Sequence, residues 1–115
     1  MRYDLENRTS NFSKKILSYL KNLKITFYNK EIVDQLLRAC LSIGANYREA
    51  NGSTSKKDFH NKIAICKKET KEAKYWIELL AHTLDDEKDK KTLRDLWQET
   101  HELTLIFSKI HKNSK

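Results

Sequence analysis

The side chains of this sequence that could do chemistry are two cysteines, four histidines and several carboxylates, and their spacing fits no catalytic or metal-binding motif. A di-iron helical bundle needs a histidine three residues after an inward-facing glutamate. No glutamate here has one, and Glu78 with His82 is a spacing that suits a hydrogen bond on a helix surface. The two glycines, Gly44 and Gly52, are too far apart to form a phosphate-binding loop. We therefore expect no enzymatic activity, no metal and no cofactor.

Cys40 and Cys66 are isolated cysteines on apolar helix faces. Free thiols of this kind are typical of a protein core in a reducing compartment. The sequence has no apolar run near the ~20 residues that a membrane-spanning helix needs, and its first residues have no apolar signal core. We expect a cytoplasmic protein that does not enter the membrane.

A row of lysines at helical spacing, with His60 among them, is the feature best suited to bind a ligand. The net charge is +7; residues 1–28 carry six basic and two acidic side chains, and residues 52–84 carry seven and four. A basic surface attracts a phosphate backbone through counterion release. The lysine row has no aromatic residue on its own face, so we expect binding without base stacking. The predicted nucleic-acid-binding residues are Lys56, Lys67, Lys71 and Lys74, with Lys14 and Lys21 adding to the same field.

The basic surface has two other interpretations that the residues leave open. It could dock an acidic protein partner with no role in nucleic-acid binding. It could also be a solvated, lysine-rich surface that keeps the protein dissolved. Binding of RNA or other nucleic acid, electrostatic and weakly sequence-specific, is the preferred prediction.

Four amphipathic segments must position these residues. The sequence has no proline and two glycines, and 34% of its residues are charged, so helix breakers are scarce. Apolar residues at helical spacing predict helices over residues 4–23, 30–51, 56–84 and 87–111. The short connections predict one all-α domain over residues 1–115, an antiparallel up-down-up-down four-helix bundle.

The connections carry capping signals. Asp4 and Asn29 are suitable N-caps for the first two helices. Ser55, followed three residues later by Asp58, forms a capping box before the third helix. Gly52 can adopt a positive φ and end the second helix. In the connection over residues 24–29 (KITFYN), we expect some of the apolar side chains to pack against the bundle.

The second and third helices have more non-solvent faces than one bundle core requires. Gly44 costs about 1 kcal/mol relative to alanine in a helix interior, so we expect another helix to approach it closely, and we place that helix in another subunit. Glu69 and Glu72 are expected to meet lysine or arginine across a helix contact. The predicted oligomer interface comprises Arg38, Ser42, Ala45 and Glu49 from the second helix and Ile65, Glu69, Glu72, Trp76 and Leu79 from the third.

Short motifs run through the first three predicted helices. They begin with YDLE at residues 3–6 and NKEI at 29–32, are strongest in SIGANYREA at 42–50, and continue with SKKDF at 55–59 and YW at 75–76. In these motifs the chain resembles the proteins encoded in intervening sequences of bacterial 23S rRNA genes, a family also labelled as ribosomal proteins. The resemblance covers most of residues 3–80 and fades through the fourth helix.

The resemblance implies a four-helix bundle without catalytic residues. It also implies a homo-oligomer, a ring-shaped pentamer like the related accessory proteins of diversity-generating retroelements. Those relatives bind nucleic acid through basic surfaces and partner a reverse transcriptase. From the resemblance alone, RNA or DNA and a reverse transcriptase-like or ribosomal protein are the expected partners.

Overall fold

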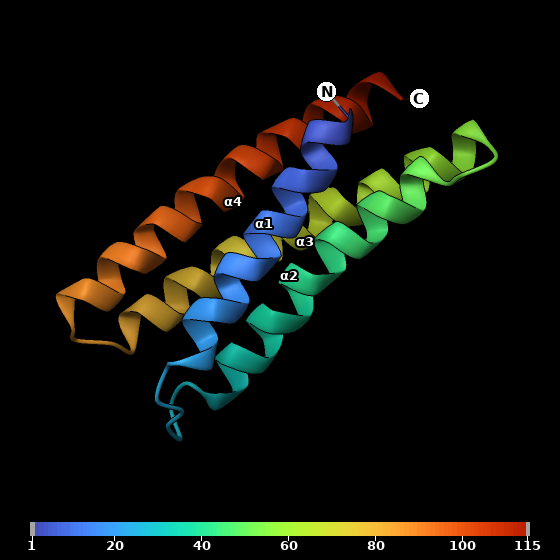
Figure 1. The fold of residues 1–115 in the computed structure, drawn as a ribbon. Coiled ribbons are helices and arrows are strands. Elements are labelled where there is room, and N and C mark those ends of the chain that lie inside the picture. Colours follow the sequence, from blue (N-terminus) through green and yellow to red (C-terminus); the bar gives the residue numbers. More distant parts are fainter. Residues whose placement is uncertain (1, 115) are drawn as a thin grey trace.

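The computed structural model describes residues 2–114, with side chains from Asp4 onward. It contains α1 (Arg2–Lys21), α2 (Lys30–Asn51), α3 (Lys56–His82) and α4 (Glu87–Asn113). The rest of the described chain is turn and loop (Figure 1). The predicted all-α four-helix bundle is confirmed.

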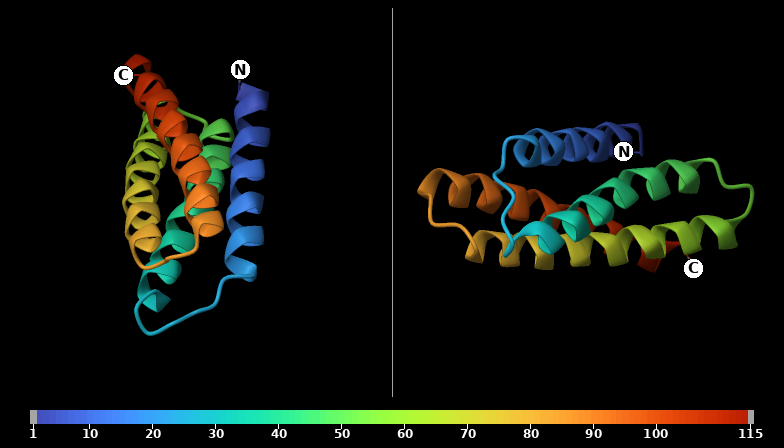
Figure 2. Two further views of the ribbon diagram at one scale, coloured as in Figure 1. Left: turned by 90° about the vertical axis from the view of Figure 1, so that its left-hand side faces the viewer. Right: turned by 90° about the horizontal axis from the view of Figure 1, so that it is seen from below.

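Consecutive helices run in opposite directions, so both described chain ends lie at one end of an elongated bundle of 46 × 23 × 20 Å (Figure 1). Each helix packs on the next along the chain, and α1 also contacts α4. The α1–α4 contact is the least extensive of the four, and α1 packs mainly against α2 (Figure 2). The α1–α4 side of the bundle is therefore the most open.

Apolar residues from all four helices form one buried cluster. Tyr47 of α2 and Phe107 of α4 meet edge to face near its centre, with ring centroids 5.7 Å apart. Full burial of one large apolar side chain stabilises a fold by about 1.5–3 kcal/mol, so this cluster is the main source of stability. At the start of α2, Val33 is buried in this cluster, whereas Ile32 is only half-buried.

Helix bounds agree with the sequence prediction for the start and end of α2 and for the starts of α3 and α4. The prediction that Asp4 caps α1 is wrong, because α1 already includes Asp4 in its first turn. A carboxylate there still interacts favourably with the helix dipole. The helix ends differ by two residues each: α1 ends at Lys21, α3 at His82 and α4 at Asn113.

Ser55 caps α3 as predicted, because its side chain accepts a 3.0 Å hydrogen bond from the Asp58 backbone N–H. Asn29 occupies the N-cap position of α2, but its side chain makes no capping bond to the helix. The positive φ expected at Gly52 is also wrong. Gly52 has φ −91°, and its N–H donates to the carbonyls of Arg48 and Glu49, which ends α2 without left-handed backbone.

The loop between α1 and α2 does not pack against the bundle, contrary to the prediction. Ile25, Phe27 and Tyr28 are 49%, 91% and 79% exposed. Asn29 is the buried residue of this connection, at 1%. Its side chain bonds the backbone of Thr26 and Lys24 within the loop, while the apolar side chains of the loop are exposed to solvent.

The close neighbour of Gly44 is α1 of the same chain, so the expectation of a second subunit at this glycine is wrong. A Cβ at Gly44 would lie 3.8 Å from Thr9 Oγ1 and 3.9 Å from Ser13 Oγ. Ser13 also donates a 3.4 Å hydrogen bond to the Cys40 carbonyl. Thr9 and Ser13 are small, which lets the two helices approach along this line.

Gly44→Ala should raise the free energy of unfolding by up to about 1 kcal/mol, because alanine is the better helix former and 3.8 Å is an ordinary van der Waals distance for the added Cβ. Urea unfolding followed by circular dichroism measures the change. Gly44→Leu is the contrast: its branches must displace Thr9 and Ser13, so it should destabilise by about 1–3 kcal/mol. A loss of stability in the alanine variant would contradict this account of the α1–α2 contact.

Candidate nucleic-acid interface

The predicted lysine row of α3 faces α4. Lys74 Nζ donates a 3.0 Å hydrogen bond to Nδ1 of His101 and lies 5.1 Å from the centroid of the Trp97 ring. Lys71 and Lys67 precede Lys74 by one and two turns and share its face, and Lys56 precedes it by five turns. Lys56 and Lys71 are exposed, and Lys67 and Lys74 are half-buried. The structure thus brings all four onto one seam.

The fourth helix adds basic and aromatic side chains that the sequence analysis missed. A shallow groove between α3 and α4 is lined by His82 of α3 and by Lys90, Arg94 and Trp97 of α4. Trp97 stacks on His101 with ring centroids 5.2 Å apart and donates a 2.9 Å hydrogen bond to Glu78. We expected no aromatic residue beside the lysines. This is correct for the lysine face of α3 itself, but Trp97 of α4 lies beside Lys74. The spacing of residues 90, 94, 97 and 101 on one face of α4 was the available signal.

All four histidines of the sequence lie on this same seam. At the far end of the seam from His82, His60 of α3 and His111 of α4 stack with ring centroids 4.2 Å apart. His60 Nδ1 is 2.8 Å from Ser114 Oγ. We name this surface of α3 and α4 the basic seam; it carries Lys56, His60, Lys67, Lys71, Lys74, His82, Lys90, Arg94, Trp97, His101 and His111.

The basic seam has little countercharge. Within the described residues, six cations of the seam form no ion pair: Lys56, Lys67, Lys71, Lys74, Lys90 and Arg94. Glu78 is the carboxylate that lines the groove, and it accepts a hydrogen bond from Trp97. Unneutralised cations in a row attract the phosphates of a nucleic acid.

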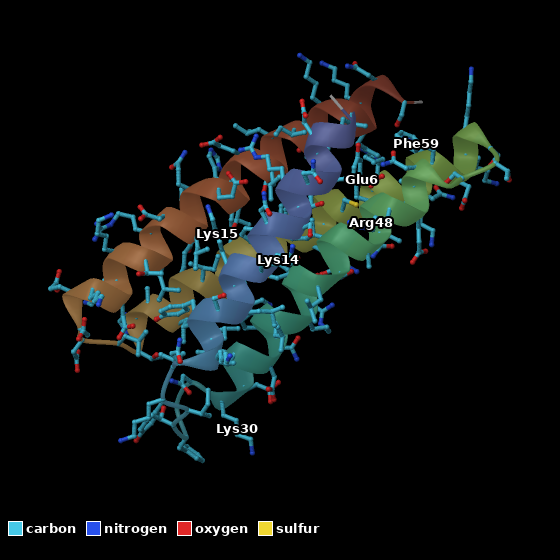
Figure 3. The ribbon with its side chains drawn as sticks, viewed as in Figure 1. Glu6, Lys14, Lys15, Lys30, Arg48 and Phe59 are labelled. Atoms are coloured by element: carbon cyan, nitrogen blue, oxygen red, sulfur yellow. The ribbon has the colours of Figure 1, made fainter. Side chains whose placement is uncertain are left out.

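Lys14 and Lys21 lie on α1, away from the basic seam, because α1 does not pack on α3. Lys14 lines an open groove between α1 and α4 together with Lys15 and Asp95. Figure 3 shows Lys14 and Lys15 on α1. Lys21 is exposed at the end of α1. The structure therefore does not join these two lysines to the other four.

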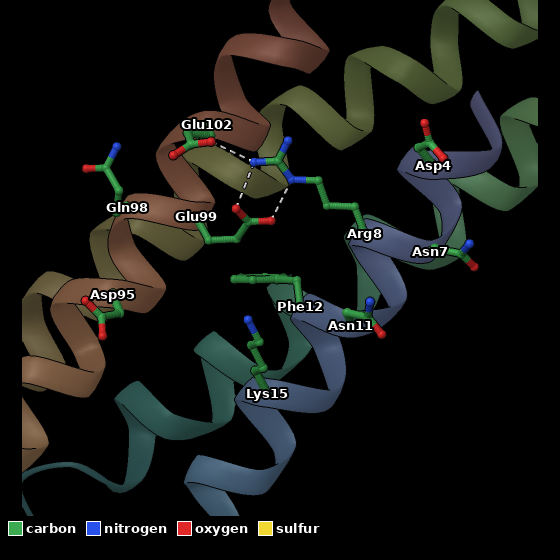
Figure 4. Close-up of a pocket in the computed structure, with 10 residues that line it drawn as sticks. All are labelled: Asp4, Asn7, Arg8, Asn11, Phe12, Lys15, Asp95, Gln98, Glu99 and Glu102. Carbon is green, nitrogen blue, oxygen red and sulfur yellow. Dashed lines mark hydrogen bonds and ion pairs between the residues drawn. The ribbon is translucent and has the colours of Figure 1, made fainter. Parts of the chain in front are cut away.

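Arg8 holds α1 to α4 across the open side of the bundle (Figure 4). Its guanidinium donates to both carboxylate oxygens of Glu99 at 2.7 and 2.8 Å and to Glu102 at 2.8 Å. The hydrogen bond to Glu99 raises the pKa of Arg8, and the hydrogen bond from Arg8 lowers the pKa of Glu102. Bidentate arginine–carboxylate pairs are among the strongest hydrogen bonds between side chains.

Arg38 makes a matching contact between α2 and α3. It lies 3.2 Å from Glu69 and 2.9 Å from Glu72, and the bond to Glu69 raises the pKa of Arg38. Ser42 donates a 3.4 Å hydrogen bond to Glu69, which is only 5% exposed. The predicted arginine partner for these glutamates is present, and it belongs to the same chain.

The remaining residues of the predicted oligomer interface lie beside this α2–α3 contact. Glu49 pairs with Lys62 at 2.8 Å, and Ala45 is exposed. Ile65, Trp76 and Leu79 are half-buried on α3. The indole Nε1 of Trp76 is buried and has no hydrogen-bond partner in the described chain. The oligomer interface along this strip stays a prediction.

The cysteines are buried and free, as the sequence predicted. Burial raises the pKa of Cys66 to about 12 and that of Cys40 higher still. Their neutral thiols are therefore poor nucleophiles and poor metal ligands. Across residues 2–114, no group of three or more histidine, cysteine, aspartate or glutamate side chains is arranged to hold a metal ion. None of the described helices is long and apolar enough to span a membrane.

Both thiols should be unreactive toward a thiol reagent in the native protein at pH 8 and should react fully in 8 M urea. The pKa of Cys66 in the folded protein lies above its ordinary value of 9.0, so the unfolded chain loses the thiol proton first as the pH rises. The free energy of unfolding should therefore keep the full contribution of the buried neutral thiol below pH 9 and lose it as the pH rises toward about 12. Urea unfolding at pH 8 and pH 10 should show this loss of stability. Rapid labelling of the native protein at pH 8 would show that the core opens around these residues.

The fold and the basic seam define a small, basic four-helix-bundle protein. Residues 2–107 match the 23S rRNA-intervening sequence protein family, and the chain belongs to that family. A solved structure, a protein of unknown function from the S23 ribosomal protein family of Bacteroides thetaiotaomicron, shares the fold with a TM-score of 0.78. It is 30% identical, and the match covers 97% of this chain and 99% of that one. No curated protein matches the chain.

Proposed function

We propose that this protein acts by binding rather than catalysis, as a helical bundle that holds RNA or another nucleic acid through the basic seam. The observation that carries the proposal is the row of cations without carboxylate partners along α3 and α4. Membership of the 23S rRNA-intervening sequence protein family is consistent with an RNA ligand.

The shape and chemistry of the seam favour contact with a phosphate backbone. Lysines on a straight helix present charges at intervals of one turn, about 5.4 Å, which lets several phosphates be neutralised along one strand. The Trp97 ring is already occupied by Lys74 and His101. The seam itself should therefore read charge and shape, with weak sequence preference.

Lys67→Gln/Lys71→Gln should weaken binding to a short RNA duplex and flatten its salt dependence. Each lost phosphate contact lowers the slope of log K against log [salt] by about one, so the double variant should lose about two. Fluorescence anisotropy between 50 and 200 mM KCl measures the slope.

Lys62→Gln/Lys91→Gln is the matched control, because it removes the same charge from lysines already paired with Glu49 and Asp95. Its salt slope should change by less than that of the seam variant. Equal effects of the two variants would mean that total charge, not the seam, attracts RNA. Absence of RNA binding at 50 mM KCl would refute the proposal.

A homo-oligomer is part of the proposal, with the pentamer of the related accessory proteins as the expected form. The exposed Ala45 and the half-buried Trp76 and Leu79 support an interface along the α2–α3 strip, since they present a small and an apolar surface. Such a strip is suited to burial against another copy.

Light scattering of the purified protein should give a mass several times that of one chain. Ala45→Arg should reduce that mass, because the added side chain obstructs the strip. Ala45 is exposed in the single chain, so the substitution should not disturb the fold. Leu105→Arg adds the same charge at a residue of α4 that is 57% exposed and should leave the mass unchanged. A wild-type protein with the mass of one chain would rule the oligomer out.

The second candidate function is docking of an acidic protein, for which the same uncompensated cations are the supporting observation. A reverse transcriptase-like or ribosomal protein is the partner expected from the family resemblance. Affinity purification with and without nuclease separates the two functions. Partners that survive nuclease favour direct protein docking, and partners that disappear favour a nucleic-acid tether.

A further inference from the structure

The connection between α1 and α2 presents two aromatic rings at the end of the bundle. Phe27 is 91% exposed and Tyr28 is 79% exposed. Their rings meet edge to face, with centroids 5.5 Å apart and planes at 88°. In an edge-to-face pair only one face of one ring is covered by its partner. In a stacked pair, such as Trp97 and His101 on the basic seam, each ring covers a face of the other.

The backbone that carries these rings is fixed by Asn29. The Asn29 side chain accepts a 2.8 Å hydrogen bond from the Thr26 N–H and donates one of 3.1 Å to the Lys24 carbonyl. Its backbone N–H donates to Thr26 Oγ1 at 3.2 Å, and the Lys30 N–H donates to the Thr26 carbonyl at 3.1 Å. The side chain that the sequence suggested as a helix cap is used to hold the loop in shape.

Lysines flank the two rings in the sequence. Between Lys14 and Val33 the sequence has five lysines and one carboxylate, Glu31. The lysines nearest the rings, Lys21, Lys24 and Lys30, are exposed and form no ion pair within the described residues. Lys30 projects outward from the start of α2 (Figure 3). The loop between α1 and α2 therefore combines open aromatic faces with nearby lysines that pair with no carboxylate in the described residues.

We propose that Phe27 and Tyr28 form a stacking platform for unpaired nucleotides of a structured RNA, with Lys21, Lys24 and Lys30 contacting the flanking phosphates. Aromatic rings stack on bases without sequence preference, and nearby cations follow the backbone. This inference rests on the proposed nucleic-acid-binding function and adds a second contact of different chemistry. The basic seam binds the backbone, and the loop between α1 and α2 selects unpaired bases.

The local chemistry favours nucleotides over the other ligands of an aromatic tip. Binding to a membrane surface depends on the buried apolar area and needs no fixed arrangement of the side chains. Here a buried asparagine fixes the loop that carries the two rings. A protein partner would need a broad contact surface, whereas this tip is a narrow projection. A fixed loop lowers the entropy cost of binding a small flat group.

The test compares two RNA probes of equal length, a stem with an eight-nucleotide loop and a blunt duplex. The wild type should prefer the stem-loop. Phe27→Leu/Tyr28→Leu should lower its affinity for the stem-loop by about tenfold or more, because each base–aromatic stack contributes substantially to affinity. It should leave duplex affinity unchanged. The salt slope for the stem-loop should also be unchanged, because no cation is removed.

Phe27→Trp/Tyr28→Trp is the matched control, because it keeps flat rings while changing their size. It should retain the preference for the stem-loop. Leucines keep apolar contact but lack a ring face, so a leucine variant that binds the stem-loop like the wild type would overturn the proposal. Loss of binding to phosphatidylserine vesicles in the leucine variant, with unchanged RNA binding, would assign the tip to a membrane surface and overturn it too.

The two proposals fail in different ways. If the wild type binds neither probe at 50 mM KCl, the proposed function fails and this inference with it. If Lys67→Gln/Lys71→Gln weakens binding to both probes while the leucine variant binds both like the wild type, the basic seam stands and the stacking platform alone is refuted.

Discussion

Two arginines join helices of this bundle across the edges of its apolar core. Arg8 joins α1 to α4 through Glu99 and Glu102, and Arg38 joins α2 to α3 through Glu69 and Glu72. In each case the two glutamates are one helical turn apart, so one planar guanidinium reaches both. These contacts lie at the edge of the core, one on each antiparallel pair. They matter most for α1, whose apolar contact with α4 is the least extensive in the fold.

The same pairs shape the outer surface electrostatically. Each arginine is paired with two glutamates, so each cluster has a net charge of −1 and the two clusters together have a net charge of −2. The whole chain has a net charge of +7, so the rest of it carries +9. Carboxylates that could have neutralised lysines are used to join helices instead. The cations of the basic seam and of the loop between α1 and α2 remain available to an outside anion as a result.

Much of the fold could be predicted from local patterns, because apolar periodicity and the Ser55 cap depend on residues close in sequence. What could not be predicted depends on pairing between distant segments. The α3 lysines showed no aromatic residue on their own helix face, because the ring beside Lys74, Trp97, comes from α4. Gly44 indicated a close helix but not which one, and α1 fills that place. Asn29 has the right residue type for a helix cap, yet a competing loop contact takes its side chain.

The arginine pairs and the basic seam differ in how strongly salt weakens them. Mobile ions screen charges that attract a polyanion from solution, and this attraction falls steeply as salt rises. Short, bidentate, partly desolvated pairs such as Arg8 with Glu99 are screened far less. Concentrated salt should therefore strip a bound polyanion from this protein while the bundle stays folded, which makes a high-salt wash the natural route to the ligand-free protein.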